Sequence, residues 1–322
     1  MSRQDSQPLA ISNGYALLSD RVMARISGPG ADKFVQGQFT QHVDEVTHNQ
    51  SLRAAACTHK GRAYCLTRLV RDGDDLLMDF DAAQAEASIA HLKKYLMLFR
   101  GTTMETLPDN RIIGLLGEAS AISVAGEGAR SLTEPGQALK AGDSHLIRIE
   151  NTADNIARYE WWQSTGELPV PDDIAELPLE QWLASSISAG VPWLTEASRE
   201  AYVPQMLNLQ HLQGVHFKKG CYTGQEVIAR MHFLGQLKKS LYRLSFNNTQ
   251  QAPAVGTKLL AGDKAVGEVV NALMTGEQEG EMLAVIRHDA STKRLSLDGL
   301  AEARIKLEQL PYAVPEQQPS DT

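Results

Sequence analysis

Residues 218–226, with the sequence KKGCYTGQE, combine the residue types that ligand binding and thiol chemistry require. Neighbouring lysines favour the thiolate form of a cysteine and attract carboxylates, and glycines let a backbone turn sharply or approach a ligand. The apolar run that follows predicts a helix, whose N-terminus also stabilises a thiolate. The segment therefore predicts that Cys221 is a functional thiol. The alternative is a structural cysteine beside a tight turn, because free cysteines are commonly buried.

The other candidate ligands form no recognised motif. The chain has three cysteines, Cys57, Cys65 and Cys221, and no CxxC pair. An odd number without such a pair argues against a disulfide framework and against a cysteine-based zinc site. The nine histidines show no ligand spacing, and there is no phosphate-binding GxxxxGK loop or GxSxG elbow. We therefore expect no metal site.

The charge of the chain is uneven. The net charge is −8 and the isoelectric point is about 5.6, which argues against direct tRNA binding. Residues 208–243, however, hold six lysines and arginines against a single acid, Glu226. This stretch indicates either a local anionic ligand or a solvated positive face.

Length and hydropathy define the class of protein. A chain of 322 residues predicts two or three structural units. No apolar run reaches the length of a membrane span, and residues 1–8 are polar without the apolar stretch of a secretory signal. We therefore expect a cytoplasmic protein with no membrane contact.

Periodicity predicts α and β elements that alternate irregularly. The expected helices are 31–39, 82–99 and 181–189, and the expected strands before residue 239 are 14–26 around a turn at 19–20, 52–57, 62–71, 75–80, 112–116 and 145–149. Four short segments after Lys239, at 241–246, 265–272, 282–286 and 303–310, alternate with Gly-, Asn- and Asp-rich turns and predict a small β-barrel. We accordingly expect a two-domain α+β body at 10–238, a barrel at 239–312 and a disordered tail at 313–322.

The segment 219–226 resembles the signature of the YgfZ-type folate-binding proteins, which are relatives of the aminomethyltransferase (T-protein) of the glycine cleavage system. The resemblance extends to 203–205 (VPQ), 208–210 (NLQ), 60–62 (KGR), 71–73 (RDG) and 36–38 (QGQ). It implies an α+β fold of three domains in a ring, with a C-terminal β-barrel. It also implies a tetrahydrofolate-type cofactor in the central opening.

The same resemblance implies a function. Members of the family are implicated in the assembly or repair of iron–sulfur enzymes and, through one of these, in tRNA modification. The implied partners are iron–sulfur proteins or their assembly factors, and Cys221 is the expected working group. The alternative is a folate-dependent one-carbon (aminomethyl) transferase, although no counterpart of its acidic residue near the folate is evident.

Further binding residues follow from the resemblance. Trp182 matches the family tryptophan assigned to folate contact, where an indole could stack on the flat ring; it could equally be a core residue of its helix. Arg21 stands where the family has a second tryptophan, and an arginine can also stack on a ring or pair with a carboxylate. We expect Lys218 and Lys219 to attract the glutamate tail of the folate. Tyr222 and Gln225 complete the expected set.

Overall fold

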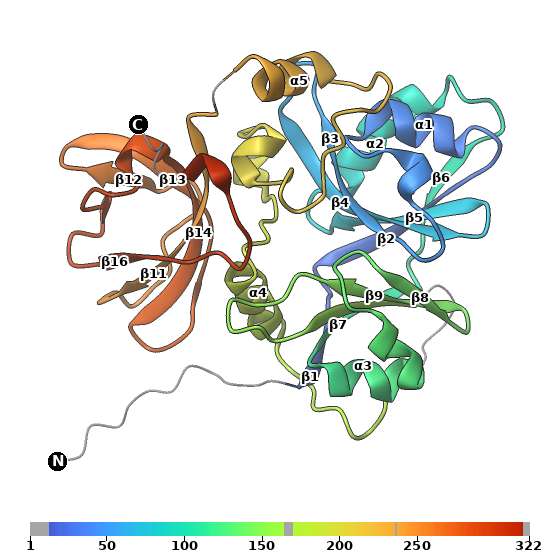
Figure 1. Ribbon diagram of the computed structural model, residues 1–322, viewed down its shortest axis with the longest axis horizontal. Helices are drawn as coiled ribbons and strands as arrows, with labels where there is room; N and C mark the ends of the chain where they lie inside the picture. The colour runs from blue at the N-terminus through green and yellow to red at the C-terminus, as the bar shows by residue number, and fades with distance from the viewer. Residues whose placement is uncertain (1–12, 164–169, 236, 318–322) are drawn as a thin grey trace.

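The computed structural model (Figure 1) describes residues 13–163, 170–235 and 237–317. It contains α-helices and three antiparallel sheets. The sheets form three lobes, and they are called here the N-terminal, middle and C-terminal sheets. No helix among the described residues is long and apolar enough to cross a membrane.

The N-terminal sheet has the order β3-β4-β5-β2-β6. Its strands are β2 (Arg21–Ser27), β3 (Leu52–Cys57), β4 (Ala63–Asp72), β5 (Asp75–Asp81) and β6 (Thr103–Thr106). Helices α1 (Ala31–Gln38) and α2 (Ala85–Leu96) pack on one face of it, where Phe34 and Leu92 are fully buried. The apolar side chains at helical spacing in both helices explain this packing.

The middle sheet has the order β1-β7-β10-β9-β8 and is covered on both faces. Its strands are β1 (Gly14–Leu17), β7 (Arg111–Leu116), β8 (Ala138–Ala141), β9 (Ser144–Ile149) and β10 (Arg158–Gln163). Helix α3 (Glu118–Ala125) covers one face and α4 (Leu179–Ser188) the other. Because β10 is central and buried, it carries Trp161 and Trp162 into the two opposite cores.

The C-terminal sheet is a curled half-barrel with the order β15-β12-β13-β14-β11-β16 (Figure 1). Its strands are β11 (Lys239–Asn247), β12 (Lys258–Ala261), β13 (Lys264–Met274), β14 (Glu279–Arg287), β15 (Ser296–Leu297) and β16 (Arg304–Glu308). Leu244, Val269 and Met282 fill its interior. Helix α5 (Gln225–Phe233) lies just before it in the chain.

Two predictions from the sequence differ from the structure. Strands β6, β8, β10, β12 and β15 were not predicted, and β10 contains Arg158 and Glu160, whose charges hide a fully buried strand. The tail predicted to be disordered from residue 313 is packed as far as residue 317. Val314 is buried, and Gln317 Nε2 donates to Ser240 Oγ at 2.8 Å and to the Leu241 carbonyl at 2.7 Å. Residues 318–322 lie outside the described residues, and the domain limits stay a prediction.

Candidate functional site

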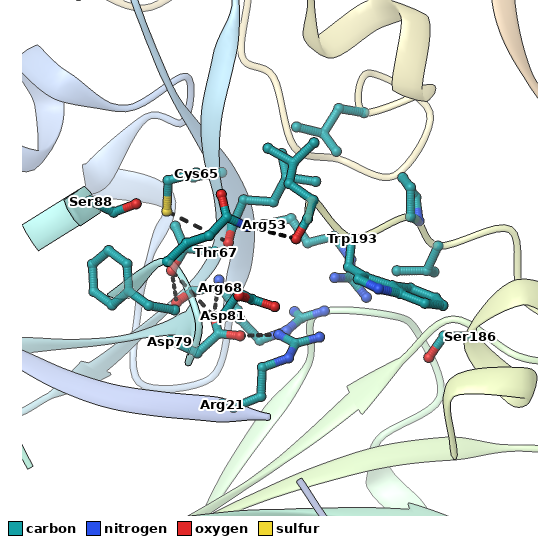
Figure 2. Close-up of a pocket in the computed structure, with 18 of the residues that line it drawn as sticks. Arg21, Arg53, Cys65, Thr67, Arg68, Asp79, Asp81, Ser88, Ser186 and Trp193 are labelled. Carbon is teal, nitrogen blue, oxygen red and sulfur yellow. Dashed lines mark hydrogen bonds and ion pairs between the residues drawn. The ribbon is translucent and has the colours of Figure 1, made fainter. Parts of the chain in front are cut away.

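A pocket lies where the N-terminal sheet meets β10, the end of α4 and the loops at 191–194 and 209–212 (Figure 2). The space between the walls of the pocket is about 840 Å³ when the part that is open to solvent is included. The enclosed cavity is much smaller, about 50 Å³. The pocket is therefore a narrow slot. Its position between separate sheets is a common location for ligand sites.

An ion pair at the floor of the pocket fixes Arg21. Its Nη1 donates to Asp79, whose other oxygen accepts from the Arg68 amide at 2.7 Å and from Thr67 Oγ1 at 3.2 Å. Burial alone would lower the pKa of Arg21, but Asp79 and Asp20 hold it above its usual value. The arginine is therefore charged and held in place by the sheet.

A second group of ion pairs links the wall of the pocket to the middle sheet. Arg53 donates to both oxygens of Glu150, at 2.9 and 2.6 Å, and Arg68 Nε lies 3.4 Å from Glu160 Oε2. Burial of Glu150 would raise its pKa, but Arg53 brings the pKa down to about 2. These pairs join the N-terminal and middle sheets, so the pocket wall is built from both.

Four residues in the wall present buried polar atoms with no hydrogen-bond partner among the described residues. They are three acceptors, Asp20 Oδ1, Asp81 Oδ1 and Gln84 Oε1, and one donor, Arg68 Nη2. Gln84 is 6% exposed and Arg68 is 3% exposed. Such unpaired groups cost about 1–3 kcal/mol each when buried, so they indicate a missing polar ligand or water.

The chemistry of these atoms fits the ring of a folate. A pterin ring carries N–H donors beside a carbonyl acceptor along one edge, and the pocket offers acceptors beside a cationic donor. Gln84 Nε2 donates to the Leu194 carbonyl at 2.9 Å, and this bond fixes the orientation of its free Oε1. Burial raises the pKa of Asp20.

Trp193 forms a wall of the pocket on the side opposite Asp79 and Cys65 (Figure 2). Its backbone is held by one side chain of β13. Asn271 Oδ1 accepts from the Trp193 amide at 3.2 Å, and Asn271 Nδ2 donates to the Trp193 carbonyl at 3.1 Å. An indole at this position provides a surface on which a flat ring could stack.

The residues expected to bind folate do not all meet at this pocket. Arg21 lines it. Trp182 is 2% exposed and lies against Gly114, with the Arg158 guanidinium 4.4 Å from its ring centre. This is the environment of a core tryptophan, and a direct folate contact by Trp182 stays a prediction.

The loop at 218–224 rests on α1 and on the turn between β3 and β4, and no described residue from 218 to 225 lines the pocket. The Thr223 amide donates to the Gly37 carbonyl at 3.1 Å. Gly224 has φ +86°, and an added Cβ would lie 2.6 Å from the Thr58 carbonyl oxygen. Only glycine fits here without strain, so the loop is held tightly while Cys221 stays exposed.

Lys219 fastens this loop to the end of α1. Its Nζ donates to the carbonyls of Gln36 at 2.7 Å, Phe39 at 2.6 Å and Gln41 at 2.6 Å. The side chain is 6% exposed, and burial lowers the pKa of Lys219 to about 7. All three donor positions are thus used inside the protein, whereas its neighbour Lys218 is exposed.

The other two members of the expected set belong to the same loop. Tyr222 is buried, and its ring centre lies 4.7 Å from Lys219 Nζ. Gln225 is half-buried, and its Oε1 accepts from the Tyr222 amide at 3.3 Å. Both side chains therefore stabilise the loop, and their contact with folate stays a prediction.

Sequence reasoning missed the residues that carry the unpaired atoms and Trp193. A signal for the acids was present, because Asp79 and Asp81 lie two apart after the apolar run 76–78 and so point to the same face of the strand. Nothing in the sequence places Gln84 or Trp193 beside them. Among the described residues, no group of three or more His, Cys, Asp or Glu side chains could hold a metal ion.

Comparison with solved structures confirms the predicted fold. The glycine cleavage system aminomethyltransferase T from Bartonella henselae superposes with a TM-score of 0.73 over 95% of this chain and 87% of that chain, at 15% sequence identity. The half-barrel at the C-terminus and the sheets before it thus form a T-protein-type architecture.

Comparison with curated proteins identifies the family. No family model matches the chain. The tRNA-modifying protein YgfZ of Escherichia coli (strain SE11) is 31% identical over 317 residues, covering 93% of both chains. The protein of the same name from Shigella boydii serotype 4 (strain Sb227) is also 31% identical over the same share of both chains. The chain therefore belongs to the family of the tRNA-modifying protein YgfZ.

Proposed function

We propose that this protein binds a tetrahydrofolate-type cofactor in the pocket beside Arg21 and supports iron–sulfur cluster enzymes in the cytoplasm. Through these enzymes it would contribute to tRNA modification, with Cys221 as the working group. The name of its relatives and the T-protein architecture support this assignment. The cofactor would supply one-carbon chemistry at the site.

The observation that carries the folate proposal is the set of unpaired polar atoms in the pocket. Gln84 and Asp81 accept hydrogen bonds from ring N–H groups, and Arg68 donates to a ring oxygen or nitrogen. Arg21 is held by Asp79 and contributes a positive charge to the floor. Trp193 provides an aromatic wall for the ring.

The proposal for Cys221 rests on its contrast with the other thiols. Cys57 and Cys65 are buried, and burial raises the pKa of both. Cys221 is exposed, three residues after the exposed Lys218, on a loop that Lys219 ties to the body. An accessible thiol on an anchored loop suits transient contact with a second molecule.

Titration with 5-formyltetrahydrofolate, followed by calorimetry, tests the pocket. We expect Gln84→Leu and Asp81→Asn each to weaken binding by about 10- to 100-fold, since hydrogen bonds to charged or buried groups contribute about 1.5–3 kcal/mol. Asp74→Asn, in the exposed turn between β4 and β5, is the matched control and should bind as wild type does. Equal affinity for all four proteins would remove the pocket from the proposal.

A complementation experiment tests the role of the thiol. Cells that lack the protein should regain thiomethylated tRNA bases when they express wild type, and should not regain them with Cys221→Ser. Calorimetry on the purified Cys221→Ser protein should show unchanged folate binding, because Cys221 lies outside the pocket. Full complementation by Cys221→Ser would show that the thiol is dispensable.

The second candidate is a folate-dependent aminomethyl transferase, which one observation favours. Such an enzyme needs an acid near the folate to move protons, and the pocket contains Asp81 with an unpaired oxygen. Given tetrahydrofolate and a lipoylated carrier already loaded with an aminomethyl group, the purified protein would then transfer the methylene group to the folate, with release of ammonia and the dihydrolipoyl carrier, and Asp81→Asn would abolish that activity. Absence of transfer by wild type excludes this candidate.

A further inference from the structure

The C-terminal end of α5 exposes an apolar pair that the fold does not cover. Phe233 is 62% exposed and Leu234 is 84% exposed. Beside them the ring of Phe217 stacks on His232, with ring centres 3.6 Å apart and planes at 7°, and Phe233 meets the edge of the same stack. These four residues are called here the α5 patch. Contiguous apolar side chains on a surface commonly mark an interaction site.

The chain around the α5 patch carries more exposed cations than acids. Lys218 follows Phe217 in the chain, Arg230 lies one helical turn before Leu234, and Lys238 and Lys239 follow the patch. All four are exposed, and Glu226 is the only acid between residues 208 and 243. The whole protein carries a net charge of −8, so this positive rim is a local feature. It is complementary to a negatively charged partner.

The α5 patch is close in the chain to the exposed thiol. Phe217 lies four residues before Cys221, and α5 begins four residues after it. Lys219 and Gly224 hold the connecting loop against the end of α1 and the turn between β3 and β4. Figure 1 shows α5 at the outer edge of the molecule, where the chain leaves for the half-barrel.

We propose that an acidic protein partner docks on the α5 patch and its positive rim, with Phe233 and Leu234 as apolar anchors at the far end of the helix that follows Cys221. The inference rests on the proposed function, to which it adds the place and the chemistry of the partner. A protein fits better than a nucleic acid because the chain as a whole is acidic, with a net charge of −8, and because the most exposed anchor, Leu234, is aliphatic and offers a base no stacking surface. Aromatic and apolar anchors surrounded by charge are typical of protein interfaces.

The first experiment separates docking from folate binding. The variant is the double substitution Phe233→Ser and Leu234→Ser. The matched control is Met97→Ser and Leu98→Ser, which removes a pair that is 82% and 81% exposed at the end of α2. We expect both variants to bind 5-formyltetrahydrofolate and to unfold in urea as wild type does, because neither pair contributes to a core.

In cells that lack the protein, expression of the control should restore thiomethylated tRNA bases. Expression of the Phe233/Leu234 variant should leave these bases at the level found in cells that express no copy of the protein. Restoration by the Phe233/Leu234 variant overturns the docking proposal. If wild type itself restores nothing, the proposed function fails, and the docking proposal is then decided by the second experiment alone.

The second experiment identifies the occupant. A photo-reactive p-benzoylphenylalanine at position 233 should cross-link one acidic protein in cells. The same protein, once purified, should bind wild type at least tenfold more tightly than it binds the Phe233/Leu234 variant or the charge reversal Arg230→Glu with Lys238→Glu. Its affinity should also fall as salt rises.

Three results contradict the proposal. The first is a cross-link only to a second copy of this chain, together with a dimer in light scattering that the variant breaks. The second is tRNA binding in fluorescence anisotropy that the variant abolishes. The third is a captured protein that binds all variants with equal affinity.

Discussion

Replacing Gly224 by alanine tests whether close backbone contact positions the Cys221 loop. Alanine in the left-handed region costs about 1–2 kcal/mol. The new Cβ would also lie 2.6 Å from the Thr58 carbonyl oxygen and 3.1 Å from Gly61 Cα, so the backbone must shift, at a further cost of about 1–3 kcal/mol. We therefore expect the free energy of unfolding to fall by about 2–5 kcal/mol.

The control for this substitution is Gly73→Ala. Gly73 has φ +63°, and an added Cβ would meet no atom within 4 Å, so only the backbone cost applies. Urea unfolding followed by circular dichroism should place the midpoint of Gly224→Ala below that of Gly73→Ala, with equal slopes. If the two variants lose the same stability, the contact with Thr58 contributes nothing and the argument for a tightly held loop is refuted.

Three further predictions concern two residues of the Cys221 loop and one tryptophan in the core of the middle sheet. Because the pKa of Lys219 in the folded protein is about 7, below its usual value, the unfolded chain binds more protons above pH 7. The contribution of Lys219 to the free energy of unfolding should therefore rise with pH from about 7 toward 10. The urea midpoint of wild type should rise relative to Lys219→Met between pH 6.5 and 9, and a constant difference would contradict the assignment. A brief treatment with iodoacetamide should label Cys221 well before Cys57 or Cys65, as mass spectrometry can establish; first labelling of a buried thiol would refute the exposure argument. Trp182→Ala should lower the free energy of unfolding by about 3–5 kcal/mol, because a fully packed indole is lost, and a loss below 1 kcal/mol would contradict core packing.

The T-protein-type fold was predicted from the resemblance of residues 219–226 and the other matching segments, whereas periodicity and turn residues predicted individual elements. The meander at 52–80 and the four strands predicted after Lys239 lie close to the observed limits of β3–β5, β11, β13, β14 and β16. β10 was not predicted, because Arg158 and Glu160 interrupt its apolar pattern. In the folded protein Arg158 donates to Ser186 Oγ of α4 at 2.6 Å, and Glu160 lies 3.4 Å from Arg68 of β4; such pairing at long range leaves no local signal.

The candidate site was predicted only in part for the same reason. Cys221 and Arg21 were identified, and the structure places the first on the surface and the second in the pocket. Lys219 was expected to face an anionic ligand, but three backbone carbonyls from a segment 180 residues earlier surround it. The position of Trp193 depends on Asn271 of the half-barrel, and no local pattern could reveal that contact.

The first two strands of the chain, β1 and β2, belong to different sheets, and this affects the order in which the sheets can fold during synthesis. The N-terminal sheet uses only residues 21–106, whereas β1 pairs with β7, which ends at residue 116, and the middle sheet is complete only when β10 ends at residue 163. On a ribosome the N-terminal sheet can close first, while the segment before it remains without its partner strands. The middle sheet then assembles around a finished neighbour, and with it the ion pairs from Arg53 and Arg68 form. The pocket is therefore among the last parts of the body to be completed, after both of its walls have left the ribosome.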